Sequence, residues 1–188
     1  TVPDSSKADL DAVVNRAKEA FPGWASTNIQ DRSRVMVRFK TIMENDMDNL
    51  AELIALDNGK TVADAQSSIQ RGIDVIEYAT SLPKVLKEES SEVSPGIICT
   101  MTHAPLGVVA GITPFNFPVM VPLWMIPLAI TTGNCFIFKP SEQTPLAGLK
   151  IAEYLKEAGL PTGVFSVVNG SREAVEGICD HSHISAVA

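Results

Sequence analysis

The chain has 188 residues, of which 45% are hydrophobic and 20% charged, and this globular mix excludes a disordered chain. Its 15 basic and 22 acidic residues give a net charge of −7. That balance argues against nucleic-acid binding, because nucleic-acid-binding domains usually carry a basic excess. The three cysteines are widely spaced and form no CxxC pair, so we expect no disulfide framework and a reducing compartment.

No targeting or membrane segment is evident. The chain starts at Thr1 without a basic stretch followed by an apolar one, so we expect no signal peptide. Residues 104–138 contain no Asp, Glu, Lys or Arg, but five prolines interrupt them. Several short buried elements fit this pattern better than a membrane span. We therefore expect a cytoplasmic protein, or a mitochondrial matrix protein if the source is a eukaryote.

Helical periodicity dominates the first half of the chain. Apolar residues recur at helical spacing in three successive runs, each followed by a Pro or Gly that can end a helix. The expected helices are 10–21 before Pro22-Gly23, 35–54 with a bend near Asn45-Asp46 and an end at Asn58-Gly59, and 62–82 before Pro83.

The second half alternates between strands and helices. We expect strands at 97–102, 108–112, 135–138, 164–168 and 184–187, and helices at 118–132, 146–158 and 172–179. This alternation indicates βαβ units on a parallel sheet, and the continuously apolar strands indicate a sheet covered on both faces. The fold class is therefore α/β. Because the chain stops inside the last strand, we interpret it as a fragment of a larger protein.

The segment 107–118, GVVAGITPFNFP, carries the first candidate site. Asn116 follows a strand and lies between two aromatic residues that are bracketed by Pro114 and Pro118. Proline restricts φ, and ligands of open α/β sheets bind at the carboxyl ends of the strands. The Asn116 amide could therefore stabilise an oxyanion on an attacked carbonyl. From this segment alone, a turn Asn that satisfies loop backbone groups is the favoured interpretation.

The segment 138–145, FKPSEQTP, follows the next strand. In a nucleotide-binding βαβ unit this position faces the adenosine ribose, where Glu142 could accept and Lys139 could donate hydrogen bonds. The alternative is a solvated turn before a helix that begins at Thr144-Pro145. No G-x-G-x-x-G follows the first strand, so a dinucleotide would have to be held differently from the usual Rossmann manner.

Other candidate residues are weaker. His181 and His183 form an HxH pattern with no third ligand nearby, so we expect no metal site. Arg71 lies in a helix among mostly apolar positions. Most helix arginines are solvated, whereas a buried or half-buried guanidinium would need a carboxylate. Asp74 and Glu77 could satisfy it as a surface pair, or it could bind the carboxylate of a substrate.

Taken together, the motifs closely resemble those of the aldehyde dehydrogenase superfamily. GITPFNFPVMVPLW and GNCFIFKPSEQTP occur in order, with FPGW, DNGKT and GLPTGV around them. Phe115 before Asn116 and the following MVPLWMIPLAI are most similar to the CoA-acylating branch that acts on malonate or methylmalonate semialdehyde. The resemblance covers the whole chain but less than half of a family member.

The resemblance implies a fold and a set of site residues. Residues 1–188 would form part of the NAD-binding domain, a parallel Rossmann-like dinucleotide-binding sheet with N-terminal helices, truncated before the catalytic domain. Its helical part would be 1–87 and its βαβ dinucleotide-binding part 88–188. Asn116 would be the catalytic oxyanion donor. The cofactor-binding residues would be Thr113, Phe115, Lys139, Glu142 and Gln143, and the substrate-binding residues Arg71 and Phe117. Thr113 and Gln143 depart from the Ala and Arg expected in this branch.

The implied activity is NAD-dependent oxidation of a small aldehyde through a Cys thiohemiacetal and thioester, with CoA as acyl acceptor, in a homo-oligomer that is a dimer or tetramer. The nucleophile would lie beyond Ala188, so these residues alone should be inactive, and Cys99 and Cys135 are interpreted as ordinary strand residues. One alternative is a general aldehyde dehydrogenase that hydrolyses its thioester. Another is a dinucleotide-binding or assembly module without catalysis.

Overall fold

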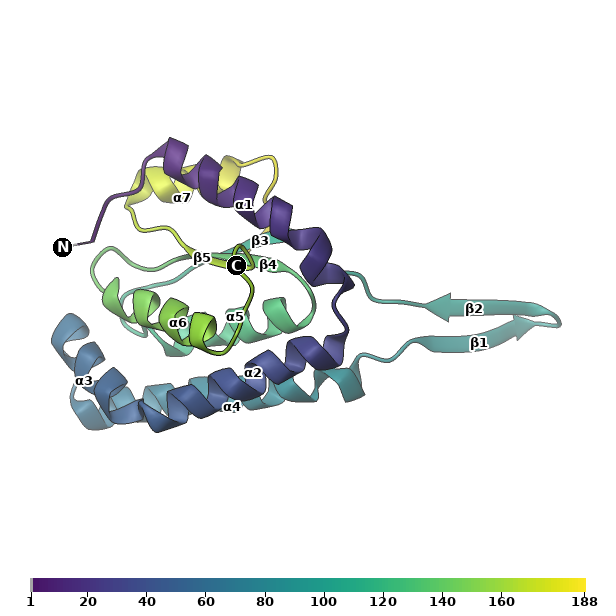
Figure 1. Cartoon of the computed structure of the whole chain (residues 1–188), viewed down its shortest axis with the longest axis horizontal. Helices are drawn as coiled ribbons and strands as arrows, with labels where there is room; N and C mark the ends of the chain where they lie inside the picture. The colour runs from purple at the N-terminus through teal and green to yellow at the C-terminus, as the bar shows by residue number, and fades with distance from the viewer. Residues whose placement is uncertain (1) are drawn as a thin grey trace.

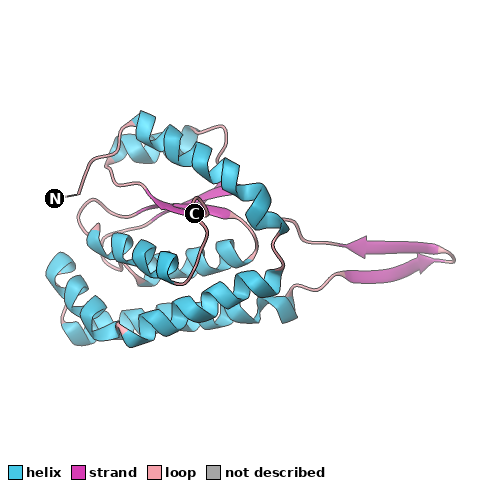
Figure 2. Cartoon of the chain, in the orientation of Figure 1, coloured by secondary structure: helices cyan, strands magenta, loops and turns pink. Residues whose placement is uncertain are grey.

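The computed structural model describes residues 2–188 and shows helices around a central sheet, with one hairpin that extends away from the body (Figure 1, Figure 2). In chain order the elements are α1 (Lys7–Ser26), α2 (Ile29–Asn45), α3 (Met47–Asn58), α4 (Val62–Val85), β1 (Glu89–Ser94), β2 (Ile97–Met101), β3 (Val108–Ile112), α5 (Met120–Thr131), β4 (Cys135–Lys139), α6 (Leu146–Glu157), β5 (Phe165–Val167), α7 (Arg172–Asp180) and β6 (Ala186–Val187).

The central sheet confirms the predicted α/β fold. Its four strands are parallel and lie in the order β5-β4-β3-β6. The chain crosses from β3 to β4 and β5 on one side and then returns to place β6 on the other side of β3. This is the order of a Rossmann-like sheet, and ligands of such sheets bind where the strand order reverses, at the carboxyl end of the first strand. Here that strand is β3.

The helices form layers on both faces of the sheet. α1 and α7 cover one face, α5 and α6 cover the other, and α2, α3 and α4 lie outside α5 and α6 (Figure 1). This arrangement explains why α5 contains no charged residue: it is packed between the sheet and α4. The uncharged segment 104–138 therefore consists mainly of β3, α5 and β4. Within residues 2–188, no helix is both long and apolar enough to span a membrane.

Helix α1 does not end at Pro22-Gly23 as predicted, but continues to Ser26. Tertiary contacts offset the backbone hydrogen bond that Pro22 cannot donate. Trp24 is buried and its Nε1 donates to the Ile130 carbonyl at the end of α5, 3.0 Å away. The buried Arg32 of α2 donates to the neighbouring Thr131 carbonyl at 2.9 Å. The FPGW motif thus attaches the end of α1 to α5.

The other helix boundaries differ in detail. The predicted run 35–54 is two helices, α2 and α3, which meet at Asp46, close to the predicted bend. The buried Tyr154 of α6 donates to Asp46 Oδ2 at 2.6 Å, which ties this junction to α6. That hydrogen bond is the main reason that the pKa of Asp46 is lowered. α4 extends beyond the predicted stop and includes Pro83 in its last turn.

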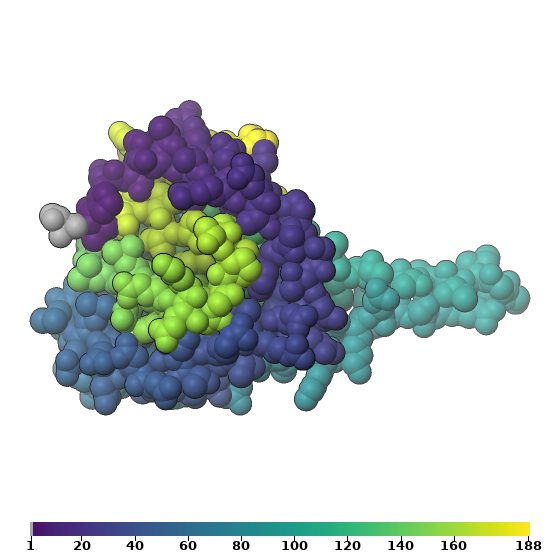
Figure 3. Space-filling view, viewed as in Figure 1, coloured from purple at the N-terminus to yellow at the C-terminus, as the bar shows by residue number. Residues whose placement is uncertain are grey.

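The hairpin β1–β2 is the largest departure from the sequence analysis. Residues 97–102 were predicted as a strand, but the observed β2 pairs antiparallel with the unpredicted β1 and lies outside the parallel sheet. The space-filling view shows the hairpin projecting from the body (Figure 3). Every residue of both strands is exposed. Cys99 is a strand residue as predicted, but it is exposed and not buried as cysteines usually are.

Candidate functional site

Two loops leave the sheet side by side at the carboxyl ends of β3 and β4. Ile112 of β3 pairs in register with Lys139 of β4, and Thr113 N–H then donates to the Lys139 carbonyl at 3.2 Å. The loop after β3 carries Asn116 and the loop after β4 carries Glu142. The structure thus brings together the two segments that the sequence analysis singled out.

The loop after β3 exposes its functional groups. Asn116 is exposed, Phe115 is 50% exposed, and Phe117 is half-buried. The backbone beneath them is held by hydrogen bonds to the Phe115 carbonyl. Asn58 Nδ2 donates to this oxygen at 2.7 Å, and Thr144 Oγ1 donates to it at 3.4 Å. The loop is therefore attached both to the end of α3 and to the loop after β4.

The turn between α3 and α4 makes further contacts with the same region. Lys60 Nζ lies 3.8 Å from the centroid of the Phe117 ring, a cation–π contact. Asp57 Oδ2 accepts from the backbone N–H of Leu146, the first residue of α6, at 3.0 Å. Partial burial lowers the pKa of Lys60 and raises that of Asp57. The DNGK sequence therefore joins the helical part of the chain to both loops.

Within the DNGKT motif, Asn58-Gly59 was predicted as a helix end, but no residue of the motif was predicted to belong to the site. Asn58 and Thr144 were also missed as neighbours of Asn116. For Asn58, the one signal in the sequence is the short polar run Asp57-Asn58 directly before Gly59. Gly59 ends α3 in the left-handed conformation, with φ of 82°. That signal identifies a helix end but not what the helix end contacts.

Lys139 and Glu142 form the polar pair that the second motif suggested. Lys139 is buried, and its Nζ lies 2.9 Å from Glu142 Oε2, while 55% of the Glu142 side chain is exposed. The backbone N–H of Glu142 and then the Lys139 ammonium lower the pKa of this carboxyl. A ribose diol needs one acceptor and one donor, so the pair fits the ribose of a dinucleotide.

The remaining cofactor candidates lie around this pair. Thr113 is buried, and within the described residues its Oγ1 has no hydrogen-bond partner. An unpaired buried hydroxyl next to the two loops is consistent with a polar ligand there. Gln143 is exposed, and its backbone N–H donates to Ser141 Oγ at 3.2 Å.

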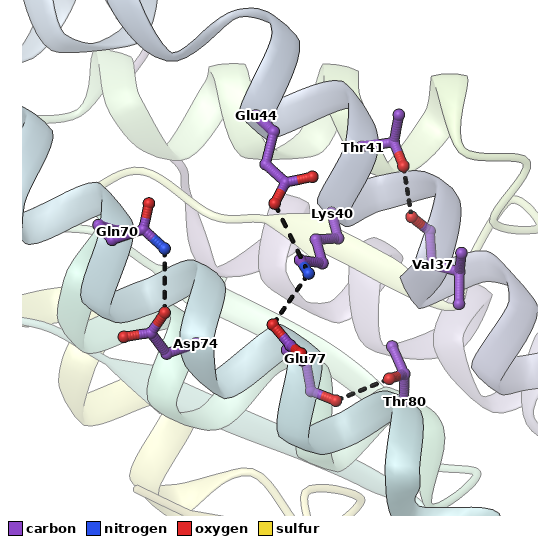
Figure 4. A network of polar contacts seen from close by, with 8 residues as sticks. All are labelled: Val37, Lys40, Thr41, Glu44, Gln70, Asp74, Glu77 and Thr80. Carbon is purple, nitrogen blue, oxygen red and sulfur yellow. Dashed lines mark hydrogen bonds and ion pairs between the residues drawn. The ribbon is translucent and has the colours of Figure 1, made fainter.

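Arg71 is exposed on α4, the solvated arrangement usual for helix arginines, and in this it differs from the apolar positions around it in the sequence. The helical turn explains the difference, because Ile69, Gly72 and Ile73 form the buried face while Arg71 lies off it. Figure 4 shows that both proposed internal partners are engaged elsewhere. Gln70 donates to Asp74 at 3.0 Å, and Lys40 of α2 donates to Glu77 at 2.9 Å.

Arg71 also lies beside a close helix contact. A Cβ placed on Gly72 would come within 2.5 Å of Leu123 Cδ1, so α4 and α5 touch at this glycine. Leu123 belongs to the first turn of α5, the helix that follows the Asn116 loop. The contact connects the helix of Arg71 to the helix that follows the loop of Asn116.

The histidines and cysteines show no catalytic arrangement in the part of the chain that the structure describes. No three His, Cys, Asp or Glu side chains within residues 2–188 are grouped as metal ligands. All three cysteines are free. Cys135 is buried in β4, and burial raises the pKa of its thiol to about 11, so it is not a thiolate near neutral pH.

Comparisons with known proteins point to one family. The model of the "Aldehyde dehydrogenase family" matches residues 1–188. "Malonate-semialdehyde dehydrogenase 2" of Geobacillus thermodenitrificans is 47% identical over 100% of this chain and 39% of its own length. The chain thus spans about two fifths of the curated relatives that it matches.

Solved structures agree with this assignment. A methylmalonate-semialdehyde dehydrogenase from Oceanimonas doudoroffii superposes with a TM-score of 0.96 and 49% identity over 98% of this chain and 38% of that chain. A protein described as a methylmalonate-semialdehyde dehydrogenase from Sinorhizobium meliloti, complexed with NAD, gives a TM-score of 0.96 and 46% identity over 99% of this chain and 38% of its own.

Proposed function

The chain belongs to the aldehyde dehydrogenase family. We propose that it is part of an enzyme that oxidises a small aldehyde with NAD, and that this aldehyde is the semialdehyde of malonate or methylmalonate, the substrates named for its relatives. The observation that carries the proposal is the placement of Asn116 and the Lys139–Glu142 pair on adjacent loops at the carboxyl end of the sheet. A carbonyl site and a dinucleotide site would then adjoin each other, as hydride transfer requires.

The residues around β4 would hold the dinucleotide. Glu142 is kept ionised by its backbone N–H and by Lys139, and it would accept from a ribose hydroxyl while Lys139 donates. A carboxylate at this position favours NAD over NADP, because it would repel a 2′-phosphate. Thr113, Phe115 and Gln143 would complete the cofactor site. When bound, NAD supplies the acceptor for the hydride that leaves the substrate.

Asn116 would act on the substrate carbonyl. In the whole protein, a cysteine thiolate outside these 188 residues would add to the aldehyde, and the Asn116 amide would donate to the resulting oxyanion. Phe117 would line the substrate site next to it. Loss of a hydride from this thiohemiacetal would leave a thioester on the cysteine, and the acyl group of that thioester would then pass to CoA. A hydrolytic enzyme would instead use water as the acyl acceptor.

The cofactor part of the proposal can be tested at Lys139. Changing Lys139 to Met in the full-length protein keeps most of the buried stem but removes the charged donor. We expect the Kd for NAD to rise roughly tenfold, the loss of about one hydrogen bond to a charged group. Isothermal titration calorimetry with NAD measures this change directly.

Lys156→Met is the matched control, since Lys156 is an exposed lysine at the far end of α6. Its Kd for NAD should equal that of the wild type. If Lys139→Met binds NAD with wild-type affinity while remaining folded, the ribose assignment is wrong.

We further propose that the enzyme is a homo-oligomer assembled through the β1–β2 hairpin. The hairpin exposes Val93, Ile97, Ile98 and Met101, each at least 49% exposed, far from the core of the chain. A two-stranded hairpin alone is marginally stable in water, and exposed apolar residues on an unpaired edge favour association. A second copy would cover this surface.

This assembly predicts a change of mass in solution. Ile97 and Ile98 are adjacent strand residues and so point to opposite faces of the hairpin. The double variant Ile97→Glu/Ile98→Glu in the full-length protein should shift the oligomer to smaller species, measured by light scattering after size exclusion. The control is Leu56→Glu on α3, which is 86% exposed but outside the hairpin. An unchanged mass for the double variant would exclude the hairpin as the interface.

A further inference from the structure

We propose that Asn58 is a positioning residue for the oxyanion donor: it holds the peptide from which Asn116 extends, and so orients the Asn116 amide. This inference rests on the proposed function, in which Asn116 donates to the oxyanion. It assigns a catalytic consequence to the end of α3, which belongs to the helical part of the chain and not to the dinucleotide-binding sheet.

The geometry centres on one carbonyl group. Asn58 Nδ2 donates to the Phe115 oxygen at 2.7 Å. Because the peptide unit is planar, this carbonyl lies in the same rigid plane as the N–H and Cα of Asn116. Fixing the direction of the Phe115 oxygen therefore fixes the orientation from which the Asn116 side chain starts. Oxyanion donors act only when they are aimed in advance at the position of the developing charge.

The second donor to this carbonyl is weaker. Thr144 Oγ1 is 3.4 Å away, near the outer limit of a hydrogen bond, whereas the Asn58 contact is short. A carbonyl oxygen has two lone pairs, so the two donors can act together. Pro114 restricts the backbone before Phe115, but Phe115 and Asn116 are exposed and have no burial to hold them. The Asn58 amide is therefore the principal restraint on this peptide.

Neighbouring contacts brace Asn58 itself. Gly59, in the left-handed conformation, ends α3 directly after it. On one side Asp57 accepts from the Leu146 N–H at 3.0 Å, and on the other Lys60 lies over the Phe117 ring at 3.8 Å. The turn thus contacts residues on both sides of Asn116, through Phe115 and Phe117, without requiring contact with the substrate.

The test uses Asn58→Ala and Asn58→Asp in the full-length enzyme. Asn58→Ala should slow acylation, seen as the burst of NADH in a single turnover, by about three- to tenfold, the value of one hydrogen bond. The KM for the aldehyde and the Kd for NAD should stay near wild type. Asn58→Asp keeps the shape of the side chain but turns an acceptor toward the Phe115 carbonyl. At about pH 8 its burst rate should therefore fall further below wild type than that of Asn58→Ala.

Asn58→Asp also gives a pH signature. A protonated Asp carries an O–H that can donate to the Phe115 oxygen, and this hydrogen bond raises its pKa above the usual value of about 4. The burst rate of Asn58→Asp relative to wild type should therefore rise as the pH falls from about 8 to about 5. Asn58→Ala should show no such recovery. If Asn58 had a merely structural role, the ratio of the Asn58→Asp burst rate to the wild-type burst rate would not depend on pH.

The matched control is Gln66→Glu on α4. Gln66 Nε2 donates to Asp48 of α3 at 2.8 Å within the same helical layer, so the change likewise replaces a donor by an acceptor. Its burst rate should equal that of the wild type at each pH.

A double variant separates this inference from the proposed function. Asn58→Ala combined with Asn116→Ala should be no slower than Asn116→Ala alone, because Asn58 acts through Asn116. The positioning role would be overturned if the burst rate of the double variant fell by the product of the two single-variant losses, or if Asn58→Asp gave a wild-type burst at about pH 8. If Asn116→Ala itself acylates at the wild-type rate, the oxyanion assignment fails first, which is a different result.

Discussion

Replacing Asn116 by Ala in the full-length enzyme should lower kcat by about 10²–10³, the usual cost of one lost oxyanion donor. The side chain is exposed at the carboxyl end of β3, so its removal leaves no cavity in the core. The loss should therefore come from the transition state and not from unfolding. The measurement is the rate of the NADH burst in a single turnover, with thermal unfolding recorded on the same samples.

Two comparisons make this result specific. The Kd for NAD should barely change, because the proposed ribose ligands, Lys139 and Glu142, lie on the next loop. Asn15→Ala, at an exposed position of α1, should acylate like the wild type. If Asn116→Ala gives a wild-type burst, Asn116 is a turn residue, which is the other interpretation that its sequence context allows.

The parallel sheet could be predicted because its signal is local and redundant. All five residues of β4 are buried, and a strand covered on both faces has a continuous apolar sequence. The alternation with helices then restricts how such strands can be connected. The same logic placed the Asn116 loop and the Lys139–Glu142 loop at one edge, since the carboxyl ends of parallel strands lie together.

The features that were missed depend on distant partners. The strand β1, ESSEVS, is polar and lacks strand periodicity, and it forms only because β2 pairs with it. Continuation of α1 past Pro22 depends on Trp24, whose hydrogen bond acceptor is 106 residues away. Asn58 lies 57 residues from Phe115, and a side chain that donates to a backbone carbonyl leaves no pattern in a single sequence. The secondary-structure propensities of neighbouring residues cannot predict contacts between residues this far apart in the sequence.

Arg71 of α4 is the residue proposed to bind the carboxylate of the substrate. Its exposure on α4 removes the argument from burial that suggested a carboxylate partner. The two carboxylates that could have paired with Arg71 have other partners, since Asp74 accepts from Gln70 and Glu77 accepts from Lys40 (Figure 4). The guanidinium next to the α4–α5 contact is thus available to a ligand, and a planar cation binds carboxylates in a bidentate manner.

Arg71→Leu in the full-length enzyme should therefore reduce kcat/KM for malonate or methylmalonate semialdehyde by roughly 10- to 100-fold. That range corresponds to about 1.5–3 kcal/mol of charge-assisted hydrogen bonding. Propanal has no carboxylate, so its kcat/KM should be nearly unchanged by the same substitution. Steady-state assays with both aldehydes measure the two values on one preparation of protein.

Arg34→Leu serves as the control, because Arg34 is an exposed arginine of the same helical layer that pairs only at the surface, with Asp31. It should leave both aldehydes unaffected, since exposed ion pairs contribute little. Equal losses on the two aldehydes in Arg71→Leu would show that Arg71 supports the fold and not the substrate. A loss confined to the semialdehyde would instead place the carboxylate-binding group on α4, so that selection of the substrate and, through Asn58, orientation of the oxyanion donor would both depend on the helical part of the chain.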